Sequence, residues 1–211
     1  MLLIRRMNRR VLSLFGLAVL AGAAFTPLSV RAQGGPSTPA GSPPPEAQQP
    51  PKGEDQAVSL AKLDGVKGYK GLEFGSAFSA AKDLELEQDR GQLKIYKKKG
   101  EPLLIGSALL ETVLYFYFDG KLYGVSFHTN DGQDSLALKT LFGEAFGAGE
   151  PSADGGPSTI WIGKKNGALY DLNTSSGEAS AFLFDIKLHD AFLAYEKAAL
   201  EKAADQLVKG E

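Results

Sequence analysis

The chain of 211 residues is 43% hydrophobic and 23% charged, values usual for a soluble globular protein, and it contains no cysteine, which excludes disulfides and thiolate chemistry. Residues 1–32 hold five arginines and no acid, and the rest of the chain carries 18 basic and 25 acidic side chains, a net charge of −7. An acidic protein is a poor partner for nucleic acid or anionic lipid, so we exclude both as partner classes.

The first 32 residues are typical of a secretory signal peptide. MLLIRRMNRR is basic, the next fifteen residues are apolar, and Val30 and Ala32 occupy the −3 and −1 positions of a cleavage site. We therefore expect cleavage after Ala32 and a periplasmic or secreted protein, whereas an uncleaved segment would anchor the chain in a membrane. Arg9-Arg10 partly resembles a twin-arginine signal, so both export routes stay open.

Residues 33–56 are predicted to form a disordered, proline-rich linker. Seven of the eleven prolines lie between Pro36 and Pro51, with no aromatic or branched apolar residue among them. Such a segment buries too little surface to offset the entropy lost on ordering. Residues 57–211 are then long enough for a single domain with a sizeable core.

The first half of this domain is expected to consist mainly of strands. Residues 92–99 alternate between apolar and polar side chains, and the apolar run over 102–118 is too long for one strand. We expect a short strand near Leu72, a helix over 77–87 capped by Ser76, a strand over 92–99, and a break at Gly106-Ser107.

Residues 112–128, TVLYFYFDGKLYGVSFH, carry seven aromatic or imidazole rings in seventeen positions. Asp119-Gly120 favours a two-residue hairpin turn, because both central positions of a type I′ turn need positive φ. That turn would place Phe116 opposite Tyr123 and make one face of the ribbon apolar. We interpret this face as core and not as an aromatic platform for a ligand.

The second half predicts a helix, a further hairpin, a strand and a long terminal helix. The expected elements are a helix over 135–147, a hairpin over 158–174 turning at Asn166-Gly167, a strand over 179–188, and a helix of about eighteen residues capped by Asp190. The last turns of this helix are expected to leave the domain, and Leu193, Leu200 and Leu207 recur every seven residues.

Together these elements predict an α+β fold. We expect a mostly antiparallel sheet of about six to seven strands, with two short helices and a long C-terminal helix packed on one face. No internal repeat is evident.

The weak candidates for a binding site are two tyrosines and one polar cluster. Tyr115 and Tyr117 would share the second face of the ribbon, either beneath a helix or open to solvent. His128, Asp131 and Asp134 lie in a segment whose composition is similar to a calcium loop without its closing glutamate, so a turn that bonds its own backbone is favoured. No catalytic residue, metal ligand or cofactor is predicted.

GYKGLEFG at 68–75 and GKLYGV at 120–125 are similar to segments of a set of uncharacterised exported bacterial domains. The resemblance extends over roughly 66–200 and involves glycines and core rings. It implies an exported α+β domain and brings no activity.

The sequence therefore predicts an exported envelope protein of unknown activity. We favour a non-catalytic binding or accessory domain that binds an envelope protein or a small ligand. The sequence supports a binding protein better than an enzyme. The alternatives are a structural protein that forms a homodimer through its C-terminal helix, and a hydrolase with dispersed acidic residues.

Overall fold

The computed structural model describes residues 53–78, 83–152 and 156–210. The predicted signal peptide and all but the end of the predicted linker lie outside these residues. The described helices are α3 (Gly53–Asp64), α4 (Gly132–Phe146) and α5 (Ile186–Lys209).

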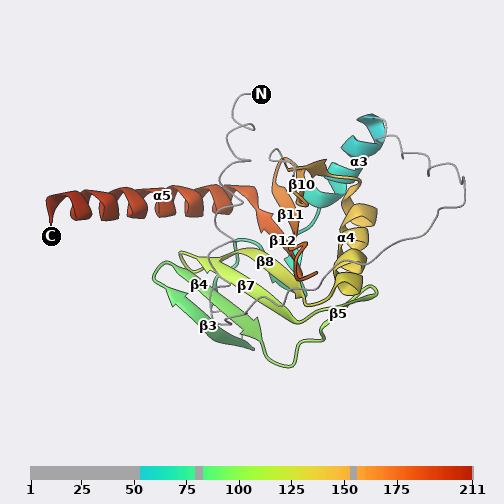
Figure 1. The fold of residues 1–211 in the computed structure, drawn as a ribbon, viewed down its shortest axis with the longest axis horizontal. Helices are drawn as coiled ribbons and strands as arrows, with labels where there is room; N and C mark the ends of the chain where they lie inside the picture. The colour runs from blue at the N-terminus through green and yellow to red at the C-terminus, as the bar shows by residue number, and fades with distance from the viewer. Residues whose placement is uncertain (1–52, 79–82, 153–155, 211) are drawn as a thin grey trace, which may run out of the picture. The chain divides into compact units, whose positions relative to one another are not determined.

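Eight antiparallel strands form the large sheet, which confirms the α+β fold with slightly more strands than expected (Figure 1). Two short hairpins, β1–β2 and β5–β6, lie outside it. The sheet strands are β3 (Leu84–Arg90), β4 (Leu93–Lys98), β7 (Thr112–Phe118), β8 (Lys121–Thr129), β9 (Glu150–Pro151), β10 (Thr159–Ile162), β11 (Asn166–Leu172) and β12 (Ala179–Asp185). The hairpin strands are β1 (Gly68–Tyr69), β2 (Leu72–Glu73), β5 (Leu104–Ile105) and β6 (Ala108–Leu109).

The strand order β3-β4-β7-β8-β12-β11-β10-β9 divides the sheet into two four-stranded meanders. Each meander follows a helix, α3 for the first and α4 for the second, and their last strands, β8 and β12, pair antiparallel at the centre. The topology is therefore an approximate duplication that the sequence does not reveal. Different residues can satisfy the same strand pattern, because a strand needs only side chains that alternate correctly between faces.

The helices cover both faces of the sheet, not one as expected. Leu63 of α3 and Leu138 and Phe142 of α4 belong to a buried cluster with the tyrosines of β7, on the side we call the α4 face. Phe192 of α5 stacks on Tyr123 of β8, with ring centroids 5.4 Å apart, on the opposite side, the α5 face. The domain therefore has two apolar layers separated by the sheet.

The β7–β8 hairpin has the predicted turn and a different register. Asp119 and Gly120 have φ of 49° and 72°, as the turn requires. A bulge then leaves Tyr123 without a partner and places Phe116 opposite Gly124. Beyond the bulge the predicted pairing is wrong by one residue, so Phe127 lies on the α4 face instead of beside Phe116.

Three other element predictions are corrected. Residues 84–87, expected in a helix, begin β3, where Leu84 and Leu86 alternate along a strand. Asn166-Gly167 starts β11 and is not a turn, because the chain reverses at 163–165. The helix expected to be capped by Asp190 begins at Ile186, and α3 is an additional helix that begins within the predicted linker.

Candidate functional site

Tyr115 and Tyr117 lie inside the core, not on an open surface. Both side chains are buried and point to the α4 face. The ring centroid of Tyr69, from the β1–β2 hairpin, is 6.3 Å from that of Tyr115, and the centroid of Phe78 is 5.6 Å from that of Tyr117. The segment that leads from β1 to Phe78 therefore covers the two tyrosines, and they form no aromatic platform. Because both tyrosine side chains are buried, they are part of the hydrophobic core.

A polar cluster surrounds the Tyr115 hydroxyl. This hydroxyl donates a hydrogen bond of 2.7 Å to Oε1 of Glu101, and Nζ of Lys70 lies 3.7 Å from the same oxygen. The Glu101 side chain is only 3% exposed. Burial and the hydrogen bond to Glu101 raise the pKa of Tyr115, and burial with the charge of Glu101 raises the pKa of Tyr69 to about 12. Both phenols therefore stay protonated, and the Tyr115 hydroxyl serves as the donor to Glu101.

Sequence reasoning missed Glu101 and Lys70. Glu101 directly follows Gly100 and precedes Pro102, a context typical of an exposed loop. Lys70 occupies a turn at φ 44°, which orients its side chain across the Tyr69 ring, 5.4 Å from the centroid. The cluster therefore ties the β1–β2 hairpin to the sheet. It consists of a buried carboxylate, a partly exposed ammonium group and one phenol donor.

His128 lies on the other side of the sheet, on the α5 face of β8. Its Nε2 is 2.7 Å from Oγ of Ser126, two residues earlier on the same strand. Burial and the nearby charge of Lys97 lower the pKa of His128 to about 4, so its imidazole is neutral at pH 7. A serine beside a neutral imidazole has the composition of a nucleophile–base pair.

The surroundings of this pair do not favour acyl transfer. An imidazole with a pKa near 4 is a weak base at neutral pH. Ser126 pairs with Leu114 on one side and Phe182 on the other, so the amides of this part of β8 serve the sheet and do not form an oxyanion site. The hydrogen bond instead satisfies a serine that is fully buried.

Asp131 and Asp134 hold local backbone amides. Asp131 caps α4, accepting hydrogen bonds from the amides of Gln133 and Asp134 at 2.8 and 2.9 Å, and these bonds lower its pKa. Oδ1 of Asp134 accepts a bond from the amide of Leu109 at 2.8 Å, which fastens β6 to α4. Within the described ranges no group of three or more potential metal-ligating side chains is present. Both carboxylates are engaged with backbone amides, Asp131 as the N-cap of α4 and Asp134 with β6.

Asp64, at the end of α3, is a residue that sequence reasoning missed. Its carboxylate accepts hydrogen bonds from the three successive amides of residues 164–166, at 2.9, 2.7 and 3.2 Å. Burial alone would raise the pKa of Asp64, but the three amide bonds outweigh it and lower the pKa. The Asn166 side chain donates to the carbonyl of Leu63, in the last turn of α3, and to that of Val66, just after the helix. No sequence signal links residues about a hundred positions apart.

His189 is a further missed residue, and it lies on the side of α5 that faces the sheet. The imidazole is 4% exposed, and its centroid is 4.5 Å from that of Phe184 and 5.9 Å from that of Tyr123. Neither ring nitrogen has a hydrogen-bond partner within the described residues. Burial lowers the pKa of His189 to about 4. The imidazole therefore packs as a neutral ring in the layer that attaches α5 to the sheet.

A cavity of about 460 Å³ opens beside the first turn of α5. None of the residues predicted as a binding site lines it. Its walls carry both signs of charge, so the cavity favours neither cations nor anions. The lining residues are Lys164, Lys165, Asp185, Ile186, Lys187 and Asp190. Asp185 is already engaged, because Oδ1 caps the helix by accepting the amide of Leu188 at 2.8 Å.

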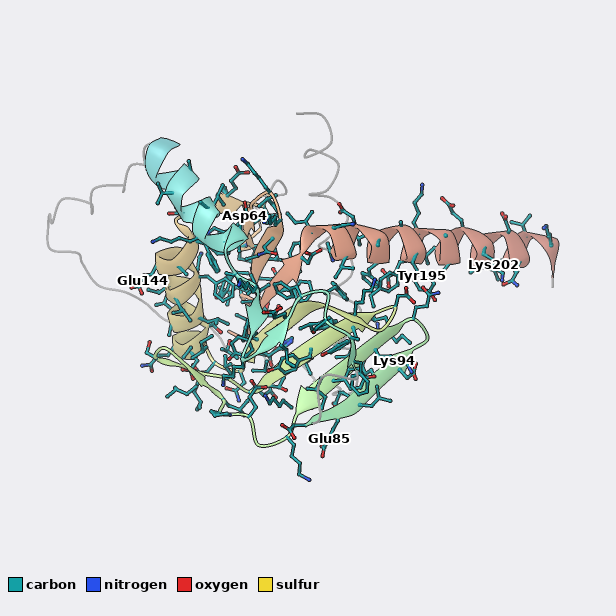
Figure 2. All side chains as sticks on the ribbon, turned by 180° about the vertical axis from the view of Figure 1, so that it is seen from behind. Asp64, Glu85, Lys94, Glu144, Tyr195 and Lys202 are labelled. Atoms are coloured by element: carbon teal, nitrogen blue, oxygen red, sulfur yellow. The ribbon has the colours of Figure 1, made fainter. Side chains whose placement is uncertain are left out.

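The outer part of α5 is the most exposed apolar surface of the domain. Residues 197–209, which we call the projecting segment, are all exposed and extend about 20 Å at 1.5 Å per residue. Leu200, Leu207 and Val208 are 71%, 83% and 88% exposed. Figure 2 shows Tyr195 near the sheet and Lys202 on the part of the helix beyond it. The predicted departure of the last turns from the domain is confirmed.

The predicted site residues thus occupy three separate places: the α4 face, the α5 face and the start of α4. No family model, no curated protein and no solved structure matches this chain. Among the residues that the structure describes, no helix is long and apolar enough to cross a membrane. Within the described part of the chain, the projecting segment has the most exposed large apolar side chains, and internal packing does not explain them.

Proposed function

We propose that this chain is an exported envelope protein whose domain binds a partner without catalysing a reaction. The composition of residues 1–32 supports export. Cell fractionation with mass spectrometry tests it, and we expect a periplasmic or secreted product beginning at Gln33. Replacing Arg9 and Arg10 by lysine distinguishes the routes, since only the twin-arginine route depends on the arginine pair.

The observation that carries the binding role is the exposure of the projecting segment. A helix of thirteen residues in water is only marginally stable without tertiary contacts. Leu200 and Leu207 lie on it with most of their surface in solvent, an arrangement typical of a contact surface. We therefore assign the projecting segment the role of binding a partner and the sheet the role of supporting it.

A photo-crosslinking side chain, placed at one position of the exported protein at a time, tests this role. Leu200 and Lys202 lie on opposite sides of the same helix, so position 202 is a matched control. We expect covalent adducts in intact cells from position 200 and few from position 202. Equal yields from the two positions would contradict the proposal, because a specific contact surface has one side.

A hydrolase is the second candidate, supported by the 2.7 Å contact between Ser126 and His128. A fluorophosphonate probe that reacts with activated serines decides between the candidates. We expect no labelling of the folded protein, since Ser126 is fully buried and its neighbour is weakly basic. Labelling that disappears in Ser126→Ala would favour the hydrolase.

A further inference from the structure

Five of the seven apolar residues of the projecting segment form one continuous stripe, and Ala198 and Ala199 lie outside it. The five are spaced at i, i+3, i+4, i+7 and i+8, and every one of them is exposed. Lys202, Asp205 and Lys209 lie on the opposite side of the helix. The stripe consists of Leu200, Ala203, Ala204, Leu207 and Val208. It carries no charge, so its partner must offer an uncharged apolar surface of similar width.

The central part of the stripe has a symmetric pattern. From 200 to 207 the sequence LEKAADQL has leucine at both ends and two alanines in the middle. A two-fold axis through the midpoint of Ala203 and Ala204 would place Leu200 of one helix beside Leu207 of another, and alanine beside alanine. Such self-complementarity is what an isologous interface requires, because each copy presents the same patch.

We propose that a second copy of this chain covers the stripe, with the two projecting segments paired antiparallel about the Ala203–Ala204 midpoint. The inference rests on the proposed binding role of this segment and specifies its partner. Alanines at the crossing allow a close interaxial distance, about 8 Å, at the short end of helix packing. The four leucines then cover the crossing from both ends.

Antiparallel pairing fits this chain better than the parallel heptad pairing that the leucine spacing also suggests. A parallel pair would use Leu193 as its third layer, but Leu193 is partly buried at the base of the helix. It would also place both folded domains at the same end. The antiparallel pair keeps the domains at opposite ends and aligns the helix dipoles favourably.

A lipid surface is a less suitable occupant. Helices that lie on membranes combine bulky apolar side chains with a basic polar face. The stripe here includes two alanines, and the opposite side has mixed charge, with Lys202 and Lys209 beside Asp205. An ion pair of 3.4 Å between Lys197 and Glu201 borders the stripe. Mixed charge gives little attraction to anionic lipid.

Single-cysteine variants of the full mature chain test the pairing directly, since the protein has no cysteine of its own. In the proposed register two copies of Ala203→Cys are offset by only about 1.5 Å along the axis and should form a disulfide. Two copies of Leu200→Cys are offset by about 10.5 Å and should not, and the same holds for Leu207→Cys. A mixture of Leu200→Cys and Leu207→Cys should crosslink.

The outcomes separate the possibilities. Lys202→Cys, on the opposite side of the helix, is the control and should stay monomeric after oxidation. Crosslinking of Leu200→Cys with itself would overturn the antiparallel register and support parallel pairing. If no variant crosslinks above the level of the control, the pairing is overturned.

Light scattering of the unmodified chain provides a second measurement that needs no oxidation. We expect the average mass to rise with concentration towards that of a dimer, and Leu200→Glu to weaken association at least about tenfold, because a carboxylate would be buried in the seam. Lys202→Glu should associate as the original chain does. Circular dichroism verifies that both variants are folded.

Failure of self-pairing and failure of the binding role are distinguishable. A chain that stays monomeric and still gives adducts at position 200 but not at 202 overturns self-pairing and retains the binding role. Binding to neutral or anionic vesicles by the original chain, lost in Leu200→Glu, would identify a lipid partner and also overturn self-pairing. Monomeric protein with no preference between the two positions overturns both.

Discussion

At the scale of single residues, the polar side chains with several hydrogen-bond or ionic partners hold parts of the fold together. The Asp64 carboxylate collects three backbone amides, and Gly163 leaves room for it, since an added Cβ there would lie 2.2 Å from Oδ1. Glu101 binds the Tyr115 hydroxyl under the β1–β2 hairpin. These contacts join segments far apart in sequence, so no local pattern could predict them.

Asp64→Asn should lower the free energy of unfolding by about 1–2 kcal/mol at pH 7. This loss is kept small because the carboxylate is partly exposed and solvent weakens its interactions. The pKa of Asp64 is below its ordinary value of 3.8 in the folded state, so its contribution is present above that pH and is lost as pH falls further. Urea unfolding at pH 7 and pH 3 measures both effects. The exposed Glu144→Gln is the control and should change stability by less than about 0.5 kcal/mol.

The two histidines predict a second pH dependence. Both have a pKa lowered from 6.5 to about 4, so below pH 6.5 the unfolded chain binds more protons than the folded chain. Stability should therefore fall as pH drops from 6.5 to 4, by roughly 2 kcal/mol per histidine at pH 5. His189→Leu should remove about half of this loss in urea unfolding at pH 7.5 and 5. An unchanged pH dependence would contradict the burial of His189.

At the scale of elements, the sequence predicts turns and strands with alternating side chains, but it does not predict where a bulge interrupts the pairing of two strands. Asp119-Gly120 determined its turn because the required backbone angles are local. The bulge at Tyr123 depends on β12, since the Phe182 ring packs where a side chain on Gly124 would stand. Asn166-Gly167 is a second exception. Its sequence favours a turn, but both residues pair with β12, and the Asn166 side chain bonds to Leu63 and Val66.

Gly124→Ala tests this explanation of the bulge. The added Cβ would lie 2.3 Å from the Phe182 ring, so we expect a loss of about 1–3 kcal/mol in the free energy of unfolding. Gly143→Ala, inside α4 with nothing within 4 Å of the added Cβ, is the matched control and should stabilise by about 0.5–1 kcal/mol. Equal effects at the two positions would show that packing against Phe182 does not place the bulge.

At the scale of the whole molecule, the order of the predicted strands and helices indicated the α+β class, and the candidate site could be predicted only in part. The ring-rich ribbon was correctly interpreted as core, because so many apolar rings are stable only when buried. Tyr115 and Tyr117 lie on the α4 face and His128 on the α5 face, which the sequence could not show, since faces cannot be assigned once a bulge shifts the register. The sequence showed the seven-residue spacing of the leucines of α5, but it did not show which of them are exposed.

Hydrogen exchange along α5 at rising protein concentration tests the role of the projecting segment most directly. The amides of 186–196, which pack on the sheet, should be protected at every concentration. Those of 197–209 should exchange rapidly in dilute protein and become protected as the concentration rises, and Leu200→Glu should abolish the change. Rapid exchange of 197–209 at every concentration would contradict the pairing of the projecting segments.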